Sequence, residues 1–356
     1  MYVNEFLLKE CYEKMHIPEN YLSPVTCGVM GAAMLPVWTH SIKKVAKEMP
    51  KEKMPLLGVG AAFSFLSMMF NVPLIGGTTG HAVGGTLIAL LFGPEASCIA
   101  VSIALLIQAV LFGDGGILAL GANCFNMAFV LPFVGFYMYK LLMKLMGANS
   151  QEKSSAHYIS AAIASYMGIN VAALCASIEF GLQPMLFKDA AGNALYCPYD
   201  LSISIPGMMI PHLFVAGLVE AAFTVAVFAF VRKTSPDLIF ENWTTDSVAD
   251  KPKRHFPVYA LLAALIAACP LGLLATGTAW GEWGADEIAG ISQNGKALGY
   301  TPKGLANGWS LDVLIPDYAV SGIGEVAGYI ISAILGVAIL VIVFKLASLP
   351  MKRKAD

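Results

Sequence analysis

Long apolar runs constrain what this chain can fold into more than any other feature of the sequence. A transmembrane helix needs about 20 predominantly apolar residues. The chain of 356 residues is 57% hydrophobic and 13% charged, whereas a typical soluble domain has about 25% charged residues. We therefore predict an all-α polytopic membrane protein of about nine spans, of which the third is short. The predicted spans are 24–42, 55–75, 81–93, 94–112, 117–146, 157–180, 207–231, 256–276 and 324–347.

The distribution of Lys and Arg predicts the orientation of these spans, because cytoplasmic segments are enriched in both residues. With the N-terminus outside, nine spans place all but five of the 22 Lys and Arg residues in cytoplasmic segments. The five exceptions are Lys9, Lys14, Lys188, Lys296 and Lys303. We predict an external N-terminus and a cytoplasmic C-terminus in the cell membrane.

The spans divide into two predicted membrane units. Residues 15–232 hold the first seven spans, and the polar segment 233–255 is predicted to be a cytoplasmic linker. Residues 256–350 hold the last two spans, which are joined by the external loop 277–323. Residues 1–14 form an extension of uncertain status in front of the first unit.

Several function classes lack their sequence signals. There is no Gly-rich phosphate loop of the Walker type, so we do not expect the chain to hydrolyse ATP. Neither a GxSxG motif nor a HExxH pair is present, and we predict that the chain is not an enzyme. The net charge of −2 shows no excess of basic residues of the kind that binds nucleic acid.

His81 is the most informative polar residue within the apolar runs. It lies in "NVPLIGGTTGHAVGGTLIALLFG", where glycines permit a close approach of neighbouring backbones. The short segment 81–93 is then a half-length buried helix with a histidine at its external start. Polar residues inside membranes often mark function, and we interpret His81 as a candidate metal ligand. The alternative is a histidine that caps the helix.

The stretch "MHIPENYLSP" at residues 15–24 resembles the start of a protein. If the chain began at Met15, its free amine, the amide nitrogen of His16 and the His16 imidazole could chelate one metal ion. A second imidazole from His81 would complete a square of four nitrogens, a geometry that suits Ni(II) or Cu(II). The alternative is that His16 is an ordinary polar residue of an external lead-in.

These motifs are similar to those of the CbiM/NikM family, the substrate-capture subunits of nickel and cobalt importers of the energy-coupling-factor class. The resemblance covers about residues 15–232 and includes "MHIPENYLSP", "GGTTGHAVGGTLIALLFGPEA" and "LALGANCFNMAFVLP". It implies that Met15, His16 and His81 hold nickel(II) or cobalt(II) as transported substrate. It also implies a transmembrane coupling subunit and cytoplasmic ATPase subunits as partners. The C-terminal part, with "PDYAVSG", resembles a fused accessory subunit of the CbiN/NikN type.

The extension "MYVNEFLLKECYEK" departs from the family pattern, and it lacks the apolar core of a signal peptide. Translation starting at Met15, later removal of residues 1–14, and their retention are the three open accounts. Retention would remove the amine of Met15 from the site, which would then need another donor, such as the Met15 thioether or the Cys11 thiol.

Other polar residues have less specific signals. The amides of Asn123 and Asn126 could orient a histidine, or they could form hydrogen bonds between helices. His212 and Glu220 are eight residues apart and share one helical face, where they could line a path, contact a partner or form a buried pair. Asp114, in "FGDGG", is interpreted as a turn residue.

Together these features predict the substrate-specific component of an ATP-driven nickel or cobalt importer that captures its metal at the external face. A stand-alone secondary transporter or channel for divalent metal is the alternative. Its usual mark is a pair of interrupted helices in matching halves of the chain, and only residues 76–93 are interrupted in this way.

Overall fold

The computed structural model describes residues 16–75, 78–147, 154–243, 255–275, 277–293 and 295–350. The extension 1–14 and the predicted ligand Met15 lie outside the described residues, as does part of the predicted linker 233–255.

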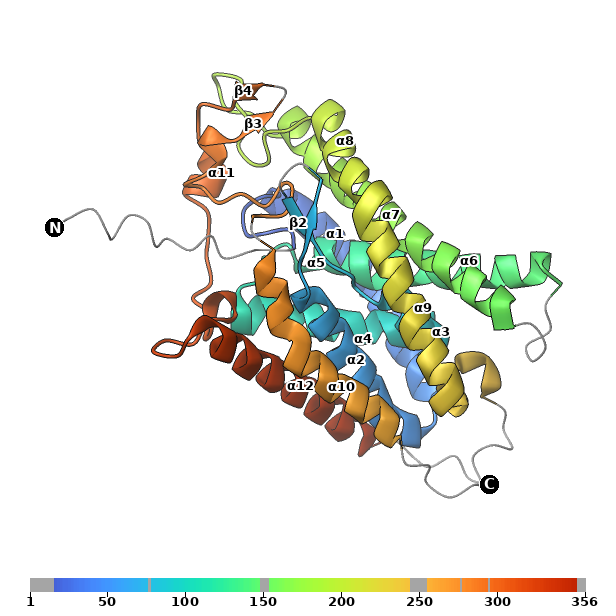
Figure 1. Cartoon of the computed structure of the whole chain (residues 1–356). Helices are drawn as coiled ribbons and strands as arrows, with labels where there is room; N and C mark the ends of the chain where they lie inside the picture. Colours follow the sequence, from blue (N-terminus) through green and yellow to red (C-terminus); the bar gives the residue numbers. More distant parts are fainter. Residues whose placement is uncertain are drawn as a thin grey trace.

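The described chain is almost entirely helical, with two small β-hairpins (Figure 1). The first hairpin pairs β1 with β2, and the second pairs β3 with β4. Three helices continue through π-helical segments: α4 into Gln108–Phe112, α5 through Cys124–Val130 into α6, and α8 through His212–Ala216 into α9. The elements are α1 (Pro24–Glu48), α2 (Met54–Met69), β1 (Val72–Leu74), β2 (Thr78–Gly80), α3 (Gly85–Phe92), α4 (Pro94–Ile107), α5 (Leu120–Asn123), α6 (Leu131–Leu145), α7 (Ser154–Leu186), α8 (Leu201–Pro211), α9 (Gly217–Thr234), α10 (Phe256–Ala268), β3 (Ser292–Gln293), β4 (Lys296–Ala297), α11 (Lys303–Ala306) and α12 (Glu325–Ser348).

Among the described residues, seven helical stretches are long and apolar enough to cross a membrane. This agrees with the prediction of a polytopic membrane protein. Two further predicted spans correspond to α2, of 16 residues, and α3, of 8 residues. Both are shorter than a full crossing requires. The number of nine spans and their orientation therefore stay predictions.

The short helices α2 and α3 lie inside the molecule. All residues of α3 and all but one of α2 are buried. Helix α12 packs along α2, with α10 beside it, so the C-terminal helices cover an interior helix of the N-terminal part (Figure 1). The two predicted membrane units thus share one hydrophobic core, which includes Leu57 and Leu66 from α2 and Leu340 and Phe344 from α12.

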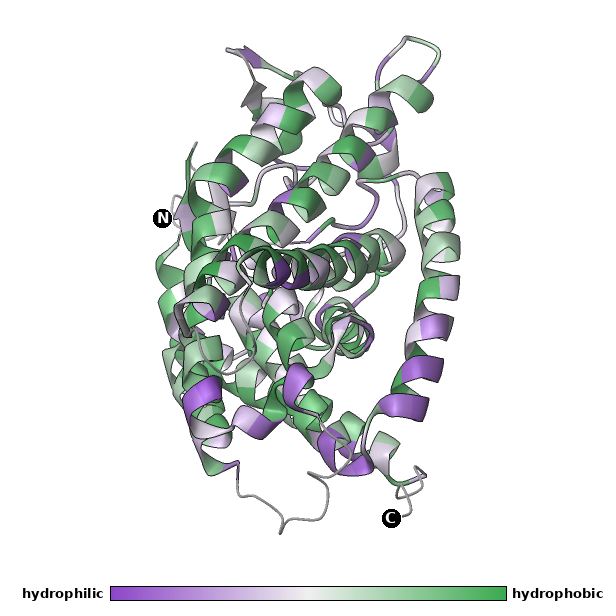
Figure 2. Cartoon of the chain, turned by 90° about the vertical axis from the view of Figure 1, so that its right-hand side faces the viewer, coloured by the Kyte–Doolittle hydropathy of each residue, from purple (hydrophilic) through white to green (hydrophobic). Residues whose placement is uncertain are grey.

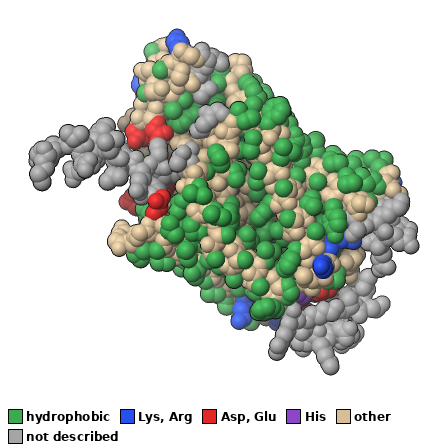
Figure 3. Space-filling view, in the orientation of Figure 1, with side chains coloured by type: hydrophobic (Ala, Val, Ile, Leu, Met, Phe, Trp, Pro, Cys, Tyr) green, Lys and Arg blue, Asp and Glu red, His purple; other side chains and the backbone are tan. Residues whose placement is uncertain are grey.

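The outer surface of the bundle is apolar, as contact with lipid requires. Figure 3 shows hydrophobic side chains over most of the face that α9 and α10 cross, with charged side chains toward its edges. Exposed examples are Phe214 and Leu218 before and within α9, and Phe256 in α10. Figure 2 shows hydrophobic residues along most of each helix and hydrophilic residues gathered at the lower helix ends. Apolar patches of this extent are rare on soluble monomers.

A close contact between Gly121 and Gly31 fixes the position of α5 against α1. A Cβ atom added to Gly121 would lie 2.5 Å from the backbone nitrogen of Gly31 and 2.6 Å from its Cα. Real carbon atoms do not approach so closely, so only glycine fits here. The helices α1 and α5 can touch because residue 121 has no side chain.

We expect Gly121→Ala to separate α5 from α1 and to destabilise the protein by about 1–3 kcal/mol through overpacking. Thermal unfolding of the purified protein in detergent measures this effect. Gly28→Ala on α1 is the matched control, because an added Cβ there meets no described atom within 4 Å. Equal melting temperatures for the two variants would contradict the account of this contact.

Candidate metal site

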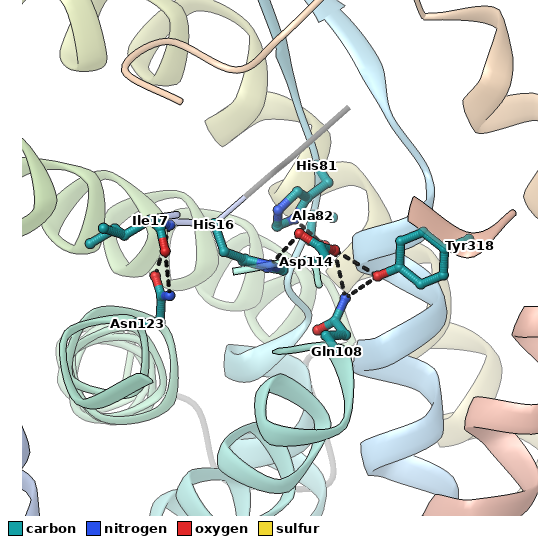
Figure 4. A network of polar contacts seen from close by, with 8 residues as sticks. All are labelled: His16, Ile17, His81, Ala82, Gln108, Asp114, Asn123 and Tyr318. Atoms are coloured by element: carbon teal, nitrogen blue, oxygen red, sulfur yellow. Dashed lines mark hydrogen bonds and ion pairs between the residues drawn. The ribbon is translucent and has the colours of Figure 1, made fainter. Parts of the chain in front are cut away.

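The fold brings His16 and His81 together. His16 follows the undescribed N-terminal residues, and His81 follows β2. Their ring centroids lie 5.1 Å apart with an interplanar angle of 65°. Both side chains are buried, with exposed fractions of 2% for His16 and 9% for His81. Two histidines predicted from separate motifs therefore share one buried position (Figure 4).

His81 is positioned by a hairpin and by a buried carboxylate. The antiparallel pair β1–β2 leads into the non-helical segment 81–84, which precedes α3. The carboxylate of Glu220 accepts hydrogen bonds from the backbone N–H groups of Val83, at 2.8 Å, and Gly84, at 3.1 Å. The hydroxyl of Ser64 donates to the carbonyl oxygen of Val83 at 2.7 Å. Glu220 and Ser64 thus fix the backbone next to His81.

Gly84 is required for the turn from this segment into α3. Its φ of +72° lies in the left-handed region that side chains disfavour. A Cβ atom there would also lie 3.2 Å from the ring of Phe63. Glycine at position 84 therefore permits a turn that the sequence did not predict.

His16 is positioned by its neighbour in the chain and by α5. The side-chain amide of Asn123 accepts a hydrogen bond from the N–H of Ile17 at 3.0 Å and donates to its carbonyl oxygen at 3.1 Å. The N–H of Gly116 donates to the same carbonyl at 2.9 Å. Both the N–H and the carbonyl group of Ile17 are therefore hydrogen-bonded, and this fixes the backbone next to His16.

Asp114 orients the ring of His16. The Nδ1 atom of His16 lies 2.8 Å from Oδ1 of Asp114, and both side chains are buried. Burial alone would raise the pKa of Asp114, but the His16 ring and the hydroxyl of Tyr318 hold this pKa below its ordinary value. The Asp114 carboxylate therefore fixes the orientation of the His16 ring.

A second pair of donors holds Asp114 from the other side. The hydroxyl of Tyr318 donates to Oδ2 of Asp114 at 2.6 Å. The amide of Gln108 donates to the same oxygen at 3.3 Å and to the Tyr318 oxygen at 3.0 Å. Figure 4 shows this chain of contacts, which runs from His16 through Asp114 to Tyr318.

Sequence reasoning missed this role of Asp114. The residue lies in the loop after the π-helical end of α4, so its place in a turn was expected, but its buried contact with His16 was not. The available signal was an acidic side chain among glycines at the end of a span. Asn123 holds the backbone of Ile17, and Asn126 donates to Glu179 at 3.0 Å. The observed hydrogen bonds of these two asparagines do not reach a histidine ring.

His212 and Glu220 do not pair with each other in the observed hydrogen bonds. His212 begins the π-helical segment before α9, and its Nδ1 atom lies 2.8 Å from the carbonyl oxygen of Met208. Glu220 is fully buried and supports the His81 segment instead. The π-helical turn between them changes the register that a regular helix would give. His212 nevertheless lines the same cavity as His16 and His81.

A cavity of about 100 Å³ lies against the two histidines. Its wall includes Asn126 and His212, and residues of the 277–323 loop, Trp280 and Glu282, complete it. Within the described part of the chain, Nε2 of His16 has no hydrogen-bond partner. The Nε2 side of the His16 ring is therefore open to a further partner, whereas Nδ1 faces Asp114.

The two histidines alone do not make a complete site. Across the described ranges, no group of three or more His, Cys, Asp or Glu side chains is placed to hold a metal ion. A metal at His16 and His81 therefore needs further donors, from the main chain or from residues outside the described ranges.

The fold defines a polytopic membrane protein with a cavity beside two buried histidines. Residues 16–238 match the family model described as cobalt uptake substrate-specific transmembrane region. Residues 254–353 match the PDGLE domain. The chain belongs to this family of cobalt and nickel transport proteins, as the sequence motifs predicted.

Curated relatives include fused proteins that align with nearly the whole chain. One is a probable fused nickel transport protein of Lactiplantibacillus plantarum, 47% identical over 93% of this chain and 97% of the relative. Another is a fused nickel transport protein of Rhodobacter capsulatus, 44% identical over 92% of this chain and 95% of the relative. A crystal structure of a truncated transition metal transporter matches with 55% identity and a TM-score of 0.57, covering 62% of this chain and 99% of that one.

We expect Glu220→Ala to destabilise the protein, because it leaves two buried backbone N–H groups without an acceptor. Each unsatisfied group costs about 1–3 kcal/mol. The measurement is thermal unfolding in detergent. Glu325→Ala, at an exposed position in the first turn of α12, is the control and is expected to change stability by about 0.5 kcal/mol or less. A melting temperature of Glu220→Ala equal to that of the control would refute the supporting role.

Proposed function

We propose that this protein is the substrate-specific component of an ATP-driven nickel or cobalt importer, and that it captures its divalent metal at the external face. The observation on which the proposal rests is the ring-to-ring placement of His16 and His81 at a buried cavity, with the Asp114 carboxylate 2.8 Å from His16. The relatives, named as nickel and cobalt transport proteins, support the substrate class.

The proposed ligands are the amine of Met15, the amide nitrogen and imidazole of His16, and the imidazole of His81. A chelate that includes the His16 amide closes through Nδ1, because that atom completes a six-membered ring with the metal. In the structure Nδ1 faces Asp114. Metal binding by this route would therefore take the atom that faces Asp114, with the amide proton of His16 and any proton on Nδ1 released to solvent, and the carboxylate would remain beside the bound cation as a compensating charge.

Nickel(II) is the first ion to test. The relatives that span both halves of the chain are named as nickel transport proteins, whereas a cobalt transport protein of Clostridioides difficile aligns with 64% of it. A planar set of four nitrogens also favours nickel over cobalt in the general order of metal affinities. Cobalt(II) remains within the proposed substrate class.

Transport requires partners in this proposal. The sequence has no ATP-binding phosphate loop, so the energy comes from cytoplasmic ATPase subunits through a transmembrane coupling subunit. The proposal retains the predicted topology of nine spans, with the external N-terminus and the cavity on the outer side. The apolar outer face of α1, with Val25, Val29 and Leu35 exposed, gives the coupling subunit or lipid a surface to contact.

We expect the purified protein to bind about one Ni(II) per chain and each of His16→Ala and His81→Ala to lose at least nine-tenths of it, because each change removes a proposed ligand. Equilibrium dialysis followed by elemental analysis measures the bound metal. His40→Ala is the control, since the His40 side chain is 67% exposed. Wild-type metal content in His81→Ala would contradict the proposed site.

The amine of Met15 can be tested separately from the imidazoles. We expect a chain produced with Met15 as its first residue to bind Ni(II) more tightly than the 356-residue chain, because only the first has the amine as a donor. Intact mass confirms each N-terminus, and isothermal titration measures the affinity. Equal affinities would exclude the amine and leave a site of two imidazoles and other donors.

A further inference from the structure

Tyr318 reaches the candidate metal site from the C-terminal part of the chain. It lies in the segment that matches the PDGLE domain, whereas His16 and Asp114 lie in the segment that matches the transmembrane region. Its hydroxyl donates to Oδ2 of Asp114 at 2.6 Å, and its ring stacks on Phe112 with centroids 4.6 Å apart. Tyr318 is itself 5% exposed. The Tyr318 hydroxyl therefore links the C-terminal part to the carboxylate beside His16.

The backbone at Tyr318 has an unfavourable left-handed conformation at the place where the side chain makes this contact. Asp317 and Tyr318 have φ values of +53° and +61°, in the left-handed region. Bulky residues rarely adopt this conformation, and it persists only where surrounding contacts enforce it. Here the hydroxyl of Ser332 donates to the carbonyl oxygen of Tyr318 at 2.9 Å, and the N–H of Ile315 donates to Leu111 at 2.9 Å. The strained turn directs the Tyr318 ring inward, toward Asp114.

We propose that Tyr318 is a positioning residue of the metal site, which acts by holding the Asp114 carboxylate in place beside His16. This inference rests on the proposed function, because it assigns Tyr318 a part in the same metal capture. This role of Tyr318 would give the C-terminal part a direct effect on metal affinity, in addition to the packing of α12 against α2.

The direction of the effect follows from the charges. A divalent cation in a buried site needs a nearby anion, and Asp114 is in contact with His16. When the metal takes Nδ1 of His16, Asp114 loses that partner and keeps the Tyr318 hydroxyl and the Gln108 amide as donors. Loss of one of these two donors then costs more with metal bound than without it. The Tyr318 hydroxyl should therefore strengthen metal binding.

The test is Tyr318→Phe in the chain that begins at Met15, with Tyr329→Phe as the matched control. The hydroxyl of Tyr329 donates to the carbonyl oxygen of Met69 at 2.8 Å, and its ring lies 5.5 Å from that of Tyr318. Both variants remove one buried hydroxyl and keep the aromatic ring. Isothermal titration with nickel(II) chloride gives Kd, and the visible absorption of the bound Ni(II) reports its ligand geometry.

We expect Tyr318→Phe to raise Kd about tenfold, the lower end of the effect of mutating residues that support a metal site from outside its ligands, and to shift the Ni(II) absorption. Tyr329→Phe should leave both unchanged, and the two metal-free variants should have similar melting temperatures. Wild-type affinity in Tyr318→Phe, or equal weakening in both variants, would overturn the positioning role while leaving the proposed function intact. A wild-type protein that binds no Ni(II) would overturn both.

Discussion

The candidate site depends on two buried carboxylates, each of which accepts hydrogen bonds from more than one donor. Asp114 accepts from His16, Tyr318 and Gln108, and Glu220 accepts from the N–H groups of Val83 and Gly84. An isolated charge in an apolar interior is very costly, so each carboxylate requires its partners to stay in place. One carboxylate therefore fixes the ring of His16, and the other fixes the backbone beside His81.

This arrangement joins parts of the chain that are distant in sequence. The donors to Asp114 come from the N-terminal lead-in, the end of α4 and the turn before α12. Removal of the C-terminal part would leave Asp114 with fewer donors and would expose the side of α2 that α12 covers. The C-terminal part therefore contributes to the structure in two places, at Asp114 and in the hydrophobic core.

Some of this could be predicted from the sequence. The apolar runs predicted a helical membrane protein, and the glycines around His81 predicted close packing, which Gly85 shows where an added Cβ would lie 2.7 Å from Leu131. The Met-His and Gly/Thr-His motifs singled out both histidines that the fold brings together. The contacts of Asp114 and Tyr318 could not be predicted, because no local pattern relates a loop after α4 to a turn before α12. Such pairings arise only when helix packing is known, as does the burial of α2 and α3 inside the bundle.

X-ray absorption spectroscopy of the nickel-loaded protein tests the central claim most directly, because it identifies the atoms bound to the metal. For a chain that begins at Met15, the account predicts a first shell of nitrogen without sulfur, with scattering from two imidazole rings and the edge feature of a square-planar Ni(II) ion. A first shell that contains sulfur, or scattering from fewer than two imidazole rings, would contradict it.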